Sequence, residues 1–306
     1  MGEIGTVGSF EVEVQGLSVR GLRAGAGRPL VLLHGWPEFS AVWTPCMQLL
    51  ASRFEVYAPD LRGFGKTTPN APGEVIPTPK VHADDLNSWV QELGLGRIGI
   101  VAHDVGAGVA QAYARAYPSM AVGLFFFNCP YPGIAHRWAE PDHLKEIWYQ
   151  SFHQMDWAAE LVGASRTTCR LYLRHFLDHW AARPGLFDDV LESWVDNFMA
   201  NDNLRGSFAW YRAIDEARRL AMKGLLPKQE AIDLPSRFLW GRHDPLLKVD
   251  WTDRLGEYFS NFELEIAEDA GHFVHFECPN LAADRIAAFF GGMPQSVWGG
   301  AADQYR

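Results

Sequence analysis

Short apolar runs alternate along the chain with segments whose apolar residues repeat at helical spacing. The runs RPLVLLHG (28–35), FEVYAPDLRGFG (54–65) and RIGIVAHD (97–104) are typical of buried strands that end at a turn. Between them, the segment VHADDLNSWVQELG (81–94) places its apolar residues on one helical face and offers Gly94 as a stop. This alternation predicts βαβ units and a mostly parallel central sheet with helices on both faces.

The alternation stops after the strand-like run AVGLFFFNCPYPG (121–133). From about residue 131 to about residue 232 we expect no strand, only helices that contain six of the twelve tryptophans. Strand-like runs return at 236–244 and 262–272, before a last helix at 280–290. We therefore predict an α/β core made of residues 1–130 and 233–306, interrupted by a helical cap at 131–232. The tail, residues 291–306, is predicted to be poorly ordered.

Composition and charge restrict the partners that we expect. The chain has 306 residues, of which 48% are hydrophobic, so it can bury a sizeable core. Its net charge of -10, without a block of Lys and Arg, argues against nucleic acid and favours a small-molecule substrate. No apolar run approaches the ~20 residues that span a bilayer, so no membrane partner is expected. The four cysteines lack metal-ligand spacing, and we expect reduced thiols in a cytoplasmic protein.

The segment VAHDVGAG (101–108) ends one predicted strand and begins a predicted helix, with Asp104 at the bend. Small residues two positions before and after it, Ala102 and Gly106, let a backbone turn sharply and expose the middle side chain. This is the pattern of a nucleophile elbow. From these letters alone, Asp104 could equally be the N-cap of a helix.

Two later residues favour the catalytic interpretation of the bend. Asp244 and His272 each follow a predicted strand, which gives the chain order nucleophile, acid, histidine. His275 is the one serious rival to His272, but His272 comes directly after the strand and its acidic turn. Asn128 also follows a strand, yet an amide cannot balance the charge of an imidazolium, so Asp244 is preferred as the acid.

The motifs HGWP, DLRGFGKT, HDVGAG, GRHDPL and GHFVHFECP resemble the epoxide hydrolase and dehalogenase branch of the α/β-hydrolases over nearly the whole chain. The resemblance implies the α/β-hydrolase fold and a nucleophilic Asp104 that forms an ester with its substrate. His272, oriented by Asp244, would activate water, and the N–H groups of Trp36 and Val105 would form the oxyanion hole. A carboxylate suits attack on an sp³ carbon because water can cleave the resulting ester, whereas a serine ether would persist. No cofactor or metal is expected.

Two tyrosines separate the members of this branch. Epoxide hydrolases resemble one another in carrying two cap tyrosines, and Tyr149 in WYQSFHQ and Tyr211 in FAWYR match their surroundings. A tyrosine hydroxyl, with a pKa of about 10, stays protonated at neutral pH and can donate to a nascent alkoxide. Phe152 and Trp210 adjoin these residues and are expected to line the substrate pocket.

The resulting hypothesis is an epoxide hydrolase that converts a hydrophobic or aromatic epoxide to a diol. A dehalogenase of haloalkanes or haloacids is the alternative, but Val105 and Gly108 stand where such enzymes carry tryptophan or arginine. A third hypothesis, a binding protein that captures a small ligand without turnover, would need a broken triad. The sequence leaves open whether the protein is a monomer or a homodimer.

Overall fold

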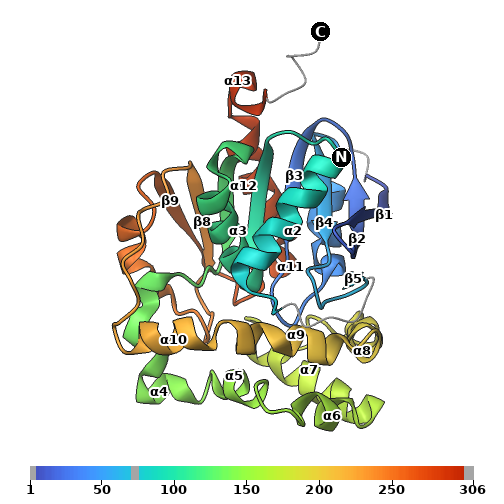
Figure 1. Ribbon diagram of the computed structural model, residues 1–306, viewed down its shortest axis with the longest axis vertical. Coiled ribbons are helices and arrows are strands. Elements are labelled where there is room, and N and C mark those ends of the chain that lie inside the picture. Colours follow the sequence, from blue (N-terminus) through green and yellow to red (C-terminus); the bar gives the residue numbers. More distant parts are fainter. Residues whose placement is uncertain (1–4, 70–75, 300–306) are drawn as a thin grey trace.

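The computed structural model describes residues 5–69 and 76–299, and nine strands of this part form one sheet. Their order is β1-β2-β4-β3-β6-β7-β8-β9, with β5 paired to β2 (Figure 1). The strands are β1 Val7–Val14, β2 Leu17–Ala24, β3 Arg28–Leu33, β4 Phe54–Pro59, β5 Thr68–Pro69, β6 Ile98–His103, β7 Ala121–Phe127, β8 Ser236–Gly241 and β9 Phe262–Ala267.

Neighbouring strands are parallel along the order β4-β3-β6-β7-β8-β9, which confirms the predicted α/β class. Strands β3, β6 and β7 are almost wholly buried, as their continuous apolar runs require when helices cover both faces. The sequence did not reveal the antiparallel pair β1 and β2, because half of the residues of β1 face solvent and the apolar positions of this strand are few.

Helices cover both faces of the sheet, with α2 and α3 in front of it and α12 behind it in Figure 1. The helical elements of this part are η1 Ser40–Trp43, α1 Thr44–Leu50, α2 Pro79–Glu92, α3 Val105–Ala116, η2 Pro118–Met120, η4 Val249–Glu257, α11 Val274–Glu277, α12 Pro279–Gly291 and α13 Gln295–Trp298. None of the helices found in residues 5–69 and 76–299 is long and apolar enough to cross a membrane.

A separate helical layer, Pro132–Met222, lies below the sheet in Figure 1, across the ends of its strands. Its elements are η3 Pro132–Ala139, α4 Pro141–Leu144, α5 Trp148–Phe152, α6 Ala158–Gly163, α7 Arg166–Trp180, α8 Leu191–Met199, α9 Asn203–Ala213 and α10 Asp215–Met222. Residues 131–231 are all described and none of them belongs to a strand, as the sequence predicted.

The end of the chain is more ordered than predicted. Residues 295–298 form α13, and Trp298 is buried against Phe290 of α12. The Arg28 guanidinium donates two hydrogen bonds to Gln295 Oε1, at 3.1 and 2.9 Å. The prediction of a poorly ordered tail was therefore wrong for residues 291–299. Most residues around Trp298 are polar or small, so the sequence pattern gave little weight to the one large apolar side chain that packs there. Residues 300–306 lie outside the described part.

Candidate active site

The strand order brings the predicted triad to one edge of the sheet. Asp104 follows β6, Asn128 follows β7, Asp244 lies beyond β8 and His272 beyond β9. Since β6, β7, β8 and β9 are parallel neighbours in this order, their carboxyl ends meet at the same edge. Open α/β sheets bind ligands outside the carboxyl ends of their strands.

Asp104 occupies a strained turn between β6 and α3. Its φ of 45° and ψ of −112° lie outside the regions that non-glycine residues usually adopt, a strain that clusters at functional sites. Gly106 makes the turn possible, because a Cβ there would lie 2.4 Å from the carbonyl oxygen of Leu33. The Gly106 N–H donates to the carbonyl of His34 at 3.0 Å, which fixes the elbow against the loop after β3.

The backbone of that loop also reaches the carboxylate. The Trp36 N–H donates to Asp104 Oδ1 at 3.0 Å, so one donor predicted for the oxyanion hole already contacts the carboxylate of Asp104. Val105 follows Asp104 at the start of α3, and both residues line one cavity, described below. The Trp36 indole is fully buried and stacks on Tyr149, with ring centroids 5.1 Å apart and an interplanar angle of 11°.

His272 and Asp244 form a buried pair. The imidazole Nδ1 lies 2.7 Å from Asp244 Oδ2, while Asp244 Oδ1 accepts the N–H groups of Leu246 and Leu247 at 2.8 and 3.0 Å. These bonds hold the carboxylate in one orientation. The other ring nitrogen, Nε2, is buried and has no hydrogen-bond partner among the described residues, which leaves it available to a water or substrate atom.

Asn128 supports the acid rather than replacing it. Its Nδ2 donates to Asp244 Oδ2 at 2.5 Å, and its Oδ1 accepts the N–H of Gly241 at 3.1 Å. The amide thus ties the carboxylate to the end of β8. The sequence singled out Asn128 only as a rejected acid, because the motif gives no sign that an amide after β7 would contact the loop after β8.

Electrostatics keep His272 protonated in the free protein. Burial alone would lower its pKa, but the charge of Asp244, its hydrogen bond, and the charges of Asp104 and Glu38 together raise the pKa to about 9. An imidazolium therefore faces the Asp104 side of the site at neutral pH.

A second buried cluster, which the sequence analysis missed, lies beside the triad. Glu38 Oε2 accepts the Gly35 N–H at 2.7 Å and lies 2.9 Å from His103 Nδ1, while Glu38 Oε1 lies 3.0 Å from His275 Nε2. The His103 ring contacts His272 at a centroid distance of 4.5 Å. The available signal was the Glu that follows HGWP, together with the second histidine of GHFVH.

The same cluster is the one group of His, Cys, Asp and Glu side chains in the described chain with the geometry to hold a metal ion. One ligand atom from each of Glu38, His103 and His275 falls within 4.8 Å of the others. Glu38 lies within 3.0 Å of a ring nitrogen of each histidine, so the carboxylate already joins the three side chains. The cluster therefore links the loop after β3, the end of β6 and α11 behind the triad.

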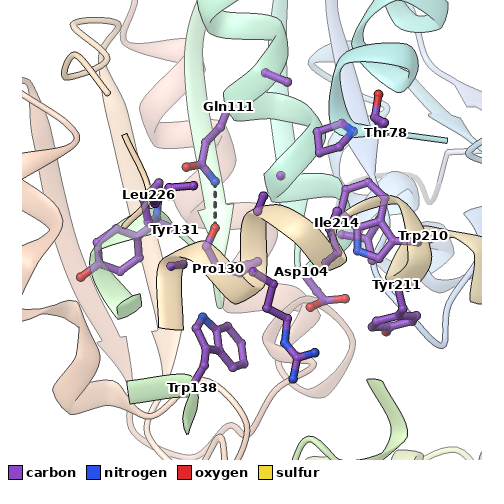
Figure 2. Close-up of a pocket in the computed structure, with 18 of the residues that line it drawn as sticks. Thr78, Asp104, Gln111, Pro130, Tyr131, Trp138, Trp210, Tyr211, Ile214 and Leu226 are labelled. Carbon is purple, nitrogen blue, oxygen red and sulfur yellow. Dashed lines mark hydrogen bonds between the residues drawn. The ribbon is translucent and has the colours of Figure 1, made fainter. Parts of the chain in front are cut away.

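A cavity of about 480 Å³ connects the elbow with the helical layer. Asp104, Tyr149 and Tyr211 all line it, and Figure 2 shows Tyr211 beside Asp104 at one end of the lining. Both tyrosines are buried, and their rings are 5.4 Å apart. Burial raises the pKa of each hydroxyl, and the charge of Asp104 adds to the shift, so both tyrosines remain protonated donors.

Of the two predicted pocket residues, the structure supports one. Trp210 lines the cavity, and its ring would lie 3.3 Å from a Cβ at position 108, so a side chain there would require Trp210 to shift. Phe152 is not part of the lining. Its half-buried ring packs against Trp148, Trp157 and Tyr172 within the helical layer.

Comparisons with known proteins agree with this fold. Residues 28–279 match the family model described as the alpha/beta hydrolase fold. A soluble epoxide hydrolase from Corynebacterium sp. is 30% identical over 288 residues, which cover 90% of this chain and 95% of that protein. Human epoxide hydrolase 4 is 27% identical, covering 94% of this chain and 79% of that one. The solved structure of the ligand-free epoxide hydrolase CorEH superposes with a TM-score of 0.82 at 27% identity, covering 94% and 99% of the two chains.

Proposed function

Because the chain belongs to the α/β-hydrolase family, we propose that it is an epoxide hydrolase that converts a hydrophobic or aromatic epoxide to a diol. One observation carries the proposal: an aspartate at the elbow shares its cavity with two buried tyrosine hydroxyls. A carboxylate can open the ring, and a tyrosine can supply the proton that the ring oxygen needs.

In the first step Asp104 attacks one ring carbon, and the carbon–oxygen bond on that carbon breaks. The electron pair passes to the epoxide oxygen, which takes a proton from Tyr149 or Tyr211. The product is a hydroxyalkyl ester of Asp104. His272 is protonated at this stage and therefore does not act as a base while the ring opens.

In the second step water cleaves the ester. Esterification removes the charge of Asp104, which is one of the interactions that raise the pKa of His272, so that pKa falls. The imidazolium then gives up its proton to solvent and becomes a base, while the tyrosinate left by the first step takes a proton back from solvent. His272 Nε2 then takes a proton from water, which attacks the ester carbonyl. The N–H groups of Trp36 and Val105 stabilise the oxyanion, and its collapse releases the diol and restores Asp104.

A product assay tests this proposal. Purified protein is incubated with styrene oxide or with a haloacid, beside an Asp104→Ala variant, and both diol and free halide are quantified. Diol that disappears in the variant is the expected result. Halide without diol would favour the dehalogenase alternative, and binding without either product would favour the non-catalytic one.

Tyrosine variants test the proton donors within the same cavity. Tyr149→Phe and Tyr211→Phe should each slow ring opening roughly 10- to 100-fold, because general acid catalysis contributes ~10²- to 10⁴-fold and two donors share it. Tyr131→Phe is the matched control, since Tyr131 lines the cavity but donates its hydroxyl to the carbonyl of Trp251 at 2.6 Å. Equal loss in all three variants would contradict these roles.

The arrangement around this activity is also part of the proposal. Residues 131–232 act as a cap over a core of residues 1–130 and 233–306, because the helical layer supplies both tyrosines. A cytoplasmic location is supported by four free cysteines. The enzyme works with its substrate and water alone, as a monomer or a homodimer.

A further inference from the structure

The cavity that holds Asp104 carries more positive than negative charge. Its lining contains Lys80, Arg115 and Arg218 against the single carboxylate of Asp104, in a chain whose net charge is -10. Lys80 is neutralised locally, because its Nζ lies 2.7 Å from Asp84. Arg115 and Arg218 are then the positive charges that remain in the lining.

Arg218 on α10 has no partner of its own. Among the residues that the structure describes, no carboxylate lies within 4.0 Å of its guanidinium, and its buried Nε has no hydrogen-bond acceptor. Asp215 attracts it only from a distance and is paired with Arg219 at 2.8 Å. Arg218 is half-buried, so an anion that entered the cavity would meet a guanidinium that no carboxylate in the described chain neutralises.

Two further observations locate this charge. Arg218 and Tyr149 line the same cavity, and the positive charge of Arg218 opposes the burial that raises the pKa of Tyr149. Arg115 on α3 donates through Nη1 to the carbonyl of Glu230, while its buried Nη2 has no partner among the described residues. The cavity thus offers an unpaired guanidinium near the reacting groups and part of a second one.

We propose that the substrate is an epoxide that carries a carboxylate, and that Arg218 binds this carboxylate beside Tyr149. The proposal rests on the proposed function and narrows its substrate class. A planar guanidinium matches a carboxylate through two parallel hydrogen bonds. The cavity volume of about 480 Å³ is within the range of small-molecule sites, so an aryl group and a carboxylate fit together.

Binding of unreactive probes tests the anion site without any turnover. Phenylacetate and phenylacetamide have the same shape and differ in charge, and calorimetry gives the affinity of each. Phenylacetate should bind roughly 10- to 100-fold more tightly, as expected for a charge-assisted hydrogen bond. Arg218→Met should abolish this preference and Arg218→Lys should retain part of it. Arg219→Met, on the same helix but outside the cavity, should leave it unchanged. Equal affinity for both probes, or a preference that survives in Arg218→Met, would overturn the proposal.

Turnover separates this proposal from the function on which it rests. The substrates are 3-phenylglycidate and its neutral amide, with diol as the product. Arg218→Met should lower kcat/KM for the acid roughly 10- to 100-fold more than for the amide. Equal losses of kcat/KM for both substrates would mean that Arg218 acts on Tyr149 and does not bind the substrate carboxylate. That result would overturn the proposal. A phenylacetate preference without diol from either epoxide would sustain the anion site and refute the epoxide hydrolase function.

Discussion

Replacing His272 by glutamine should change how the stability of the protein depends on pH. Burial lowers the pKa of the folded His272, but Asp244, Asp104 and Glu38 outweigh burial and raise it to about 9. The unfolded chain has the ordinary histidine pKa of about 6.5. A group that holds its proton more tightly when folded stabilises the fold fully below the unfolded pKa. That contribution is lost as the pH rises through about 9.

The size of the effect follows from the two pKa values. Each unit of pKa corresponds to about 1.4 kcal/mol, so the raised pKa contributes about 3 kcal/mol to the free energy of unfolding below pH 6.5. Roughly 2 to 3 kcal/mol of this should disappear between pH 6.5 and pH 9. Solvent does not screen the effect, since His272 is completely buried.

Urea unfolding of the wild type and His272→Gln at several pH values measures the difference, with tryptophan fluorescence as the probe. His275→Gln is the matched control, because burial lowers the pKa of His275 to about 4 despite the nearby Glu38. Its contribution is present above pH 6.5 and is lost as the pH falls toward 4. Between pH 6.5 and pH 9, only the His272→Gln difference should shrink. Parallel curves for the wild type and His272→Gln would refute the electrostatic account of the pair.

Three other substitutions test the supports of the site. Asn128→Ala removes one hydrogen bond to Asp244 and should destabilise the fold by about 1 to 3 kcal/mol, which chemical denaturation would detect. It should also reduce kcat, and an unchanged kcat would argue against a positioning role. Glu38→Gln weakens the bonds of this side chain to the Gly35 N–H and to His103 and should cost about 1 to 3 kcal/mol, as a thermal melt would report; a wild-type melt would speak against the network. Gly106→Ala pushes a Cβ toward the Leu33 carbonyl and should prevent soluble expression or lower the melting temperature by more than any other single methyl group added to α3.

The sequence predicted the parallel strands and the elbow well, for physical reasons. Strands buried on both faces must be apolar throughout, so β3, β6 and β7 stand out as continuous runs. The elbow needs small residues at fixed offsets, and Gly106 satisfies a steric demand that only a few residue types can meet. Such constraints are local, and a single sequence records them.

The contacts around the triad could not be predicted in the same way. Asn128 and Asp244 are 116 residues apart, and Glu38 joins His103 from 65 residues away, so no spacing rule connects them. Phe152 shows the opposite problem, because it lies three residues after Tyr149 on the same short helix, yet only Tyr149 lines the cavity. The direction of a side chain in a helical layer depends on packing that the local pattern does not contain.

A single turnover in ¹⁸O-labelled water tests the central claim, a covalent ester on Asp104, most directly. With enzyme in excess over epoxide, the new oxygen of the diol should come from the Asp104 carboxylate. We therefore predict an unlabelled diol and a heavier peptide that contains Asp104 by mass spectrometry. A labelled diol with an unlabelled Asp104 peptide would mean that water attacks the epoxide directly, and would contradict the account.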